Sequence, residues 1–316
     1  FINPSHFFSN DIDLFGKGSF FQYTNRTATI EGKKVLATLL TENNTEHILE
    51  KQEAIEELSK KVKWRQHFSA IASLVSVKNK SDFIVKWILN YKSVFPGYLS
   101  IVQIIFSLIS LLLIGLVSFE LIPFMYALIC FVLGLSITGI FIKKTTHLYT
   151  QTDKIREIFK QYHQLLNEIE LTDFKAKNLL EKQKIIQSED KKASKIFKEF
   201  SKILDAFDNR NNIIIAVFGN GLFLTEIRNA LRVEKWISNN KNVVENWFEV
   251  VAYFDAQNSL GNFKFNHQKF IFPEIKSEKE IIKSQNLGHP LLDATKRIDN
   301  NFIINDEQFF IVTGAN

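Results

Sequence analysis

The segment from Tyr98 to Ile142, YLSIVQIIFSLISLLLIGLVSFELIPFMYALICFVLGLSITGIFI, decides the fold. It consists of two charge-free runs that are separated by Glu120, close to Pro123. Each run is about 20 residues long, and a helix of that length, rising about 1.5 Å per residue, spans a hydrocarbon core of about 30 Å. The segment therefore predicts a transmembrane helical hairpin over residues 98–143, with a short turn between its two helices.

Lysines flank both outer ends of this hairpin. Lys86 and Lys92 precede it, and Lys143 and Lys144 follow it. Because lysines favour the cytoplasmic side of a membrane, we expect both ends to be cytoplasmic and only the turn to cross. The alternative is a hairpin buried in a large soluble core, which would have to hide two charge-free runs of membrane length. We expect a membrane-associated protein whose soluble parts are cytoplasmic and whose residues 98–142 contact lipid.

The composition excludes several classes of site. The 316 residues include 39 Lys and Arg and 34 Asp and Glu, a net charge of +5 that permits anionic partners without requiring them. Cys130 is the single cysteine, which rules out an internal disulfide and a cysteine-rich metal site. The 7 histidines stand singly, without metal-ligand spacing, and no catalytic residue is predicted. The chain starts at Phe1 and stops at a turn, so we expect both ends to continue into a longer protein.

The rest of the chain predicts a mainly helical protein, because it has few prolines and glycines and long stretches of helical periodicity. The predicted helices cover about 25–40, 45–60 with Thr45 as N-cap, 62–77, 153–171, 172–187, 188–207, 222–238 and 241–257. Residues 213–224 are apolar but too short to span a bilayer, so we interpret them as a buried helix segment or helix junction. A strand and turn are predicted at 281–290, and a buried strand that runs into a glycine turn at 308–316.

Five short motifs, taken in order, resemble the MutS family of DNA mismatch-repair ATPases: the first four resemble its core domain and the fifth the start of its ATPase domain. They are Gly18-Ser19-Phe20-Phe21, Asn25-Arg26-Thr27-Ala28-Thr29 with Gly32 and Leu36, Lys51-Gln52-Glu53-Ala54-Ile55-Glu56-Glu57-Leu58, the helix 247–260 with Asp255 and Ser259, and Phe272-Pro273-Glu274-Ile275. None is decisive alone, but their order and spacing together are fairly specific. The hairpin at 98–143 departs from the family's usual plan.

The resemblance also implies nucleotide-binding residues. Residues 308–316 are similar to the strand that leads into the family's phosphate-binding loop, which implies roles for Thr313, Gly314 and Asn316. The family's adenine-contacting segment matches Arg297, Ile298 and Asn300, with Arg297 in place of an aromatic residue. The lysine and magnesium ligand of that loop would come after Asn316. The resemblance therefore implies ATP and Mg²⁺ in a longer parent protein, and no ATP hydrolysis by this chain.

These observations predict a fold and a function together. The expected fold is mainly α, a MutS core-type helical domain interrupted by a transmembrane hairpin and ending in the first β-strands of an α/β P-loop ATPase domain. The expected domains are 1–97 (first part of the core), 98–143 (hairpin), 144–272 (core and lever helices) and 273–316 (start of the ATPase domain).

The expected function is ATP-dependent binding of double-stranded DNA by a membrane-tethered homodimer that pairs through its ATPase domains. Mismatch specificity is not expected, because the family's wedge domain and clamp are not found in the sequence. One alternative is a membrane-anchored helical scaffold or assembly protein without DNA activity. Another is a fully soluble helical interaction domain.

Overall fold

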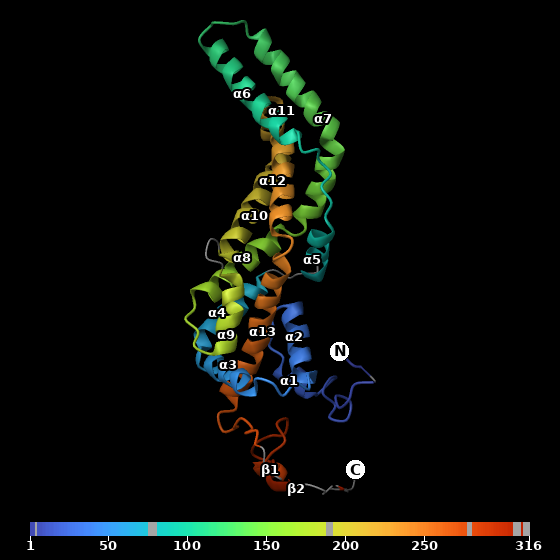
Figure 1. Ribbon diagram of the computed structural model, residues 1–316, viewed down its shortest axis with the longest axis vertical. Coiled ribbons are helices and arrows are strands. Elements are labelled where there is room, and N and C mark those ends of the chain that lie inside the picture. The colour runs from blue at the N-terminus through green and yellow to red at the C-terminus, as the bar shows by residue number, and fades with distance from the viewer. Residues whose placement is uncertain (4, 75–80, 188–191, 277–279, 306–310, 312–316) are drawn as a thin grey trace.

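The computed structural model describes most of the chain. The described residues are 1–3, 5–74, 81–187, 192–276, 280–305 and 311. Within these ranges the chain forms thirteen α-helices, one 3-10 helix and two strands, which confirms the prediction of a mainly helical protein. The molecule is elongated, with an apolar hairpin at one end and a small sheet at the other (Figure 1).

Five helices precede the hairpin, two form it, and the remaining elements follow it. The first group is α1 (Phe20–Thr24), α2 (Ile30–Thr41), α3 (Ile48–Lys60), α4 (Val62–Ser73) and α5 (Ser81–Asn90). The hairpin is α6 (Leu99–Ser118) and α7 (Met125–Asp153). The last group is α8 (Arg156–Leu171), α9 (Lys177–Ile186), α10 (Ala193–Asp208), the 3-10 helix η1 (Asn209–Asn211), α11 (Ile213–Phe223), α12 (Thr225–Asn240), α13 (Val244–Asn266), β1 (Glu280–Leu287) and β2 (Asn300–Asn305).

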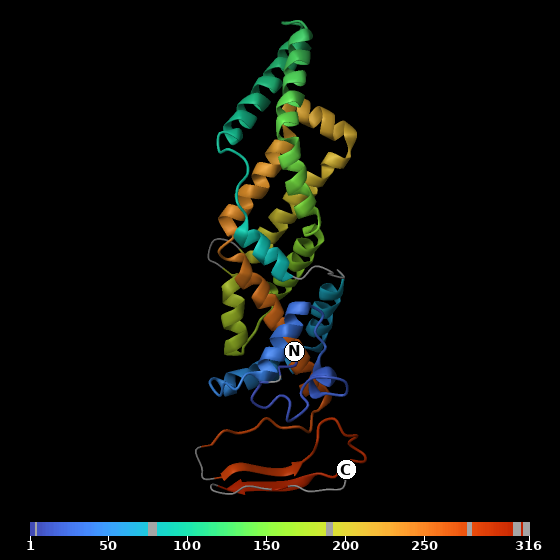
Figure 2. The same ribbon diagram turned by 90° about the vertical axis from the view of Figure 1, so that its right-hand side faces the viewer.

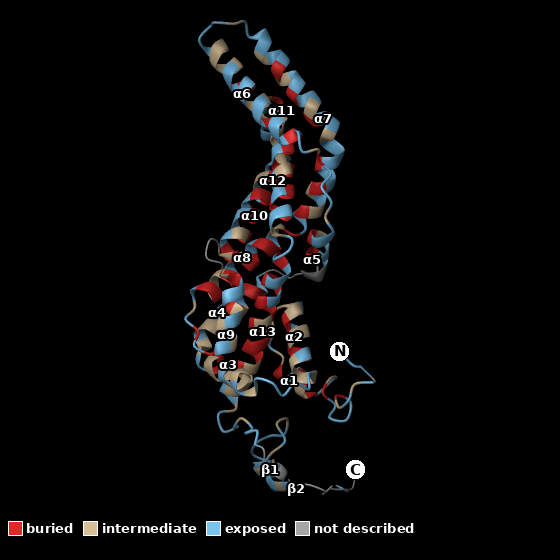
Figure 3. Cartoon of the chain, in the orientation of Figure 1, coloured by how far each residue is buried: buried red, intermediate tan, exposed pale blue. Residues whose placement is uncertain are grey.

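The core of the body is rich in aromatic side chains from helices far apart in sequence. Phe159 of α8 contacts Phe197 and Phe200 of α10, with ring centroids 4.8 and 4.7 Å apart. Phe200 in turn stacks on Trp236 of α12 at 3.8 Å. Offset and edge-on aromatic pairs of this kind add to the free energy gained from burying their large apolar surfaces. The buried residues of α8 and α10 therefore pack against each other, and Figure 3 shows buried residues on both helices.

The second hairpin helix is longer than predicted. We placed a boundary at residue 143 and a new helix at 153, but α7 continues without a break to Asp153. No glycine or proline interrupts residues 140–153, so nothing in the sequence ends the helix there. Beyond the apolar run its side chains Thr145, Leu148 and Thr152 are buried in the body. The hairpin and the body therefore share one continuous helix.

Several predicted helix boundaries were wrong. Thr45 is not an N-cap, because α3 begins at Ile48 after a left-handed His47. The helix expected from residue 172 begins at Lys177, since Glu57 accepts hydrogen bonds from the backbone N–H groups of Lys175 and Ala176, which precede it. The last three helices before the sheet also differ in their bounds, and α13 continues to Asn266 rather than ending at residue 257. Helices α1 and α5 were not predicted.

The C-terminal part ends in a two-stranded antiparallel sheet. β1 pairs with β2, and Lys283 lies opposite Ile303. The strand predicted at 281–290 is confirmed as β1. Of the strand predicted at 308–316, the structure describes Ile311, which lies outside any strand and is 77% exposed. The burial predicted for this residue was therefore wrong.

Candidate functional site

The apolar hairpin is the first candidate site. Both α6 and α7 are long and apolar enough to cross a membrane. In their most apolar stretches only 11% of α6 and 17% of α7 is buried inside the protein. The alternative of a hairpin hidden in a soluble core is therefore wrong for this structure. The two helices meet through Ser110 of α6 and Cys130 of α7, whose Oγ and Sγ atoms are 3.2 Å apart.

A belt of polar contacts begins where the apolar run of α7 ends. Thr145 donates to Glu226 of α12 at 2.9 Å, and Glu226 also pairs with Arg210 of η1, with Nε and Oε1 3.3 Å apart. One turn further along α7, Tyr149 donates to Asp208 at 2.6 Å. Burial, and then this hydrogen bond, raises the pKa of Tyr149. The belt fastens α7 to α10 and α12 just beyond the flanking lysines.

A single carboxylate holds the linker that enters α6. Glu234 of α12 accepts hydrogen bonds from the hydroxyl of Tyr91 at 3.0 Å, the hydroxyl of Ser93 at 2.7 Å and the backbone N–H of Val94 at 2.7 Å. Lys144 of α7 donates to the carbonyl of Val94 at 3.1 Å from the other side. Both ends of the hairpin are therefore bound to the body by specific polar contacts. Sequence reasoning missed Glu234, because nothing near it in sequence indicates its partners.

The second candidate site lies around a buried aspartate in the middle of α13. Asp255 is 0% exposed. Its Oδ2 atom accepts hydrogen bonds from the backbone N–H and the hydroxyl of Thr29, at 2.8 and 2.6 Å, and from the N–H of Ala28 at 3.1 Å. One turn later Ser259 accepts from the N–H of Arg26 at 2.9 Å. The motif at residues 25–29 and the motif on the helix at 247–260, which the sequence analysis identified separately, are therefore in contact.

Gly32 allows this meeting. It lies in the first turn of α2, where its N–H donates to the capping hydroxyl of Thr29 at 2.9 Å. A Cβ atom at position 32 would lie 2.7 Å from both Cβ and Cγ of Asp255 and would overlap Oδ2. Only a residue without a side chain lets α2 approach α13 this closely. We refer to Ala28, Thr29, Gly32 and Asp255 as the aspartate node.

Burial dominates the electrostatics of the node. It raises the pKa of the Asp255 carboxyl from 3.8 to about 6, although the hydrogen bonds from Thr29 and Ala28 act in the opposite direction. A carboxyl whose pKa is higher in the folded state binds more protons there than in the unfolded chain at intermediate pH. Its contribution to stability is therefore full below about pH 4 and is lost as the pH rises through about 6.

We expect Asp255→Asn to remove this pH dependence, because the amide keeps the volume and an acceptor oxygen but does not titrate. As the pH rises from the pKa of Asp255 in the unfolded chain, 3.8, to its pKa in the folded protein, about 6, the wild type should lose stability. Its free energy of unfolding should fall by about 3 kcal/mol relative to that of the variant. Urea unfolding in detergent micelles, followed by tryptophan fluorescence at several pH values, measures it. Subtracting the free energy of unfolding of one protein from that of the other removes the contribution of the other carboxyl groups, which the two proteins share. A constant difference across that pH range would contradict the assignment.

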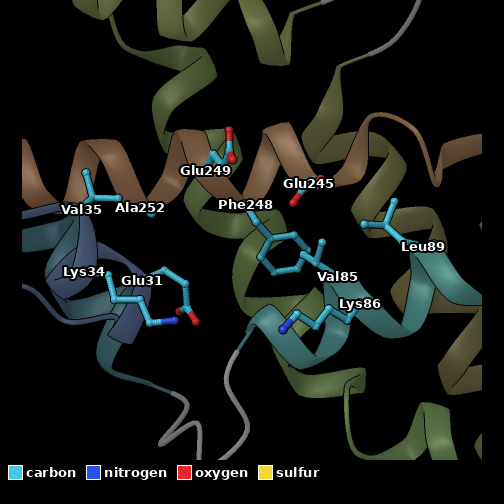
Figure 4. A pocket seen from close by; sticks show the side chains of 10 residues that line it. All are labelled: Glu31, Lys34, Val35, Val85, Lys86, Leu89, Glu245, Phe248, Glu249 and Ala252. Carbon is cyan, nitrogen blue, oxygen red and sulfur yellow. The ribbon is translucent and has the colours of Figure 1, made fainter. Parts of the chain in front are cut away.

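An open groove of about 240 Å³ lies beside the node, between α2, α5 and α13 (Figure 4). Its lining residues are Glu31, Lys34, Val35, Val85, Lys86, Leu89, Glu245, Phe248, Glu249 and Ala252. The amino groups of Lys34 and Lys86 point into the space between α2 and α5. Three glutamates and two lysines share the lining, so neither sign of charge dominates it. Sequence reasoning missed the groove because it did not predict α5.

The predicted nucleotide-binding residues fall partly outside the described structure. Thr313, Gly314 and Asn316 lie beyond the described residues. Ile298 is 82% exposed, and Asn300 is the first residue of β2.

The guanidinium of Arg297 is already engaged. Its Nε donates to Asp299 at 2.5 Å, and its Cζ lies 5.5 Å from the centroid of the Phe270 ring. The hydrogen bond from Arg297 holds the pKa of Asp299 below its ordinary value. Stacking of Arg297 on an adenine would have to compete with these contacts, and the roles of Arg297, Ile298 and Asn300 stay predictions.

Across the described ranges no group of three or more His, Cys, Asp or Glu side chains is arranged to hold a metal ion. The chain matches no protein-family model. Comparisons with curated proteins and with solved structures give no match either.

Proposed function

We propose that this chain is the helical core, with the opening strands of the ATPase domain, of a membrane-anchored MutS-like protein that binds DNA in an ATP-dependent manner. The aspartate node carries the proposal. The resemblance rests on short motifs, and two of them supply Thr29 and Asp255, which bond to each other across 226 positions of sequence. Motifs with a shared structural purpose are expected to meet in this way, whereas chance matches are not.

The course of α13 supports the same proposal. The helix starts at Val244 and runs past the node to Asn266. The segment after it leads to β1 and β2, where the resemblance places the start of the ATPase domain (Figure 2). Arg297, Ile298 and Asn300 would then contribute to an adenine pocket and 313–316 to the phosphate loop. ATP and Mg²⁺ would bind to the longer parent, which would dimerise through its ATPase domains.

Salt-dependent binding to duplex DNA tests the proposal. The chain is placed in nanodiscs of zwitterionic lipid, and binding of a fluorescent 30-mer duplex is followed by anisotropy between 50 and 200 mM salt. Because each neutralised phosphate releases about 0.9 of a counterion, three phosphate contacts would weaken binding roughly 40-fold over this range. Empty nanodiscs serve as the control.

Two other results would contradict parts of the proposed function. If the chain stays in the nanodisc and retains no DNA at 50 mM salt, DNA binding is refuted. The membrane-anchored helical scaffold without DNA activity would then be the better description. If the chain does not enter nanodiscs at all, membrane anchoring is refuted.

A further inference from the structure

Helix α11 presents an apolar surface that the body does not cover. Its sequence, IIIAVFGNGLF, carries no charge. We interpreted this segment as a buried helix segment or a helix junction, but Ile213 is 75%, Ile214 65% and Phe218 58% exposed. The expected burial was wrong, because α11 does not enter the aromatic core, whereas the alternative of a helix junction agrees with its connection to α12. It joins α12 at an angle of 84° through Leu224, which has a left-handed backbone.

Helix α11 packs on the hairpin instead (Figure 2). Gly221 and Gly134 of α7 are in such close contact that a Cβ on Gly134 would overlap the Gly221 carbonyl. The rings of Phe218 and Phe131 lie 5.8 Å apart. Gly134 is nine residues before Lys143, and at 1.5 Å per residue this is about 13 Å into the apolar run. α11 therefore lies beside the part of the hairpin that is expected to be surrounded by the hydrocarbon core of a membrane.

The polar groups at the end of α11 are bonded to protein atoms, as a helix surrounded by lipid requires. The carbonyl of Phe223 accepts hydrogen bonds from the amide of Gln103 and from the hydroxyl of Ser107, both at 3.3 Å. These are two of the few polar side chains in α6, and both are turned towards α11. Asn220 accepts from the hydroxyl of Thr225 and the N–H of Glu226, at 3.0 and 2.8 Å.

The other end of α11 begins at the water-facing boundary. The amide oxygen of Asn212 accepts hydrogen bonds from the N–H groups of Ile214 and Ile215, at 3.0 and 3.3 Å. Just before it, Arg210 donates to Thr146 of α7 at 2.8 Å, within the polar belt beyond the flanking lysines. The helix thus runs from the polar belt to the apolar run and returns through α12.

We propose that α11 is a third membrane-embedded element, a re-entrant helix seated in the cytoplasmic leaflet with Ile213, Ile214 and Phe218 against lipid acyl chains. The occupant of its exposed face is lipid, because this face is continuous with the outer surfaces of α6 and α7. The inference rests on the proposed membrane anchoring and goes beyond it, since two spans alone would anchor the chain.

Site-specific fluorescence quenching by brominated lipid tests the proposal. In a Cys130→Ser background, where a hydroxyl replaces the thiol beside Ser110, single cysteines replace Ile213, Ile214 or Phe218. Ile101→Cys on α6, 60% exposed, is the lipid-facing reference, and Lys235→Cys on the exposed side of α12 is the water-facing reference. Each variant of the full chain is labelled with bimane and reconstituted into phosphatidylcholine vesicles, with or without dibrominated phosphatidylcholine.

We expect labels on α11 to be quenched at least half as strongly as the label at residue 101, and the label at 235 to be unaffected. Quenching at 101 without quenching at any of the three α11 positions overturns the re-entrant helix and leaves the anchor in place. Absence of quenching at 101 as well overturns both. Three separate positions on α11 ensure that a local disturbance by one substitution does not decide the result.

Discussion

Replacing Gly32 with alanine should lower the free energy of unfolding by about 3 kcal/mol or more, which is large for the addition of one methyl group. The new Cβ would overlap the Asp255 side chain, which is fixed by its hydrogen bonds to Ala28 and Thr29. Relief of the overlap must either part α2 from α13 or leave buried N–H groups without an acceptor. The measurement is urea unfolding in detergent micelles, followed by tryptophan fluorescence.

A double-mutant cycle tests whether the loss arises at the node. Asp255→Gly removes the three atoms nearest to the new Cβ, so Gly32→Ala should cost much less in that background. Gly139→Ala in α7 is the matched control, because a Cβ there meets nothing within 4 Å. Equal costs of Gly32→Ala in the two backgrounds would show that the node does not require this glycine.

The double substitution Leu108→Arg with Leu133→Arg should release the chain from membranes. Leu108 lies near the middle of α6 and Leu133 near the middle of the apolar part of α7, and they are 61% and 54% exposed. A charge at the centre of a spanning helix costs about 3 kcal/mol on insertion scales, so two reduce insertion roughly 10⁴-fold. Resistance of the chain to extraction from vesicles by alkaline carbonate measures the effect.

The matched control is Leu108→Ala with Leu133→Ala, which shortens the same side chains without adding charge. This variant should remain in the membrane fraction with the wild type. Retention of the arginine variant after the carbonate wash would mean that the two side chains do not face lipid, and that the hairpin is covered by protein.

Structural features that depend on a single helix could be predicted from the sequence. The charge-free runs identified α6 and α7 because the length and composition of a spanning helix are set by the bilayer and not by neighbouring helices. The helices at 153–171 and 188–207 could be predicted for a related reason, since helical periodicity shows which face of a helix is apolar. It does not show what covers that face. The apolar segment of α11 was therefore interpreted as a buried helix segment or a helix junction, and the hairpin was not recognised as its neighbour.

The meeting of the two motifs at the node could not be predicted from local pattern. Asp255 and Thr29 are 226 positions apart, and periodicity carries no information over that distance. One signal was present nevertheless. Asp255, Gln257, Asn258 and Ser259 occupy several faces of α13 and are all buried. A polar run of this kind between aromatic residues indicates a helix that is surrounded by protein on all sides. Its buried polar side chains are expected to form hydrogen bonds with neighbouring elements.

The unbroken course of α7 limits how the protein can stand on a bilayer. A flexible linker would let the helical body change its orientation relative to the hairpin. Instead, α7 is one continuous helix up to Asp153. Beyond the flanking lysines it is hydrogen-bonded to Glu226 and Asp208. The helical body next to the hairpin is therefore joined to it by one continuous helix and by these hydrogen bonds, so its orientation on a bilayer follows that of α7. A molecule that approaches the helical body would therefore meet it in an orientation that the hairpin sets.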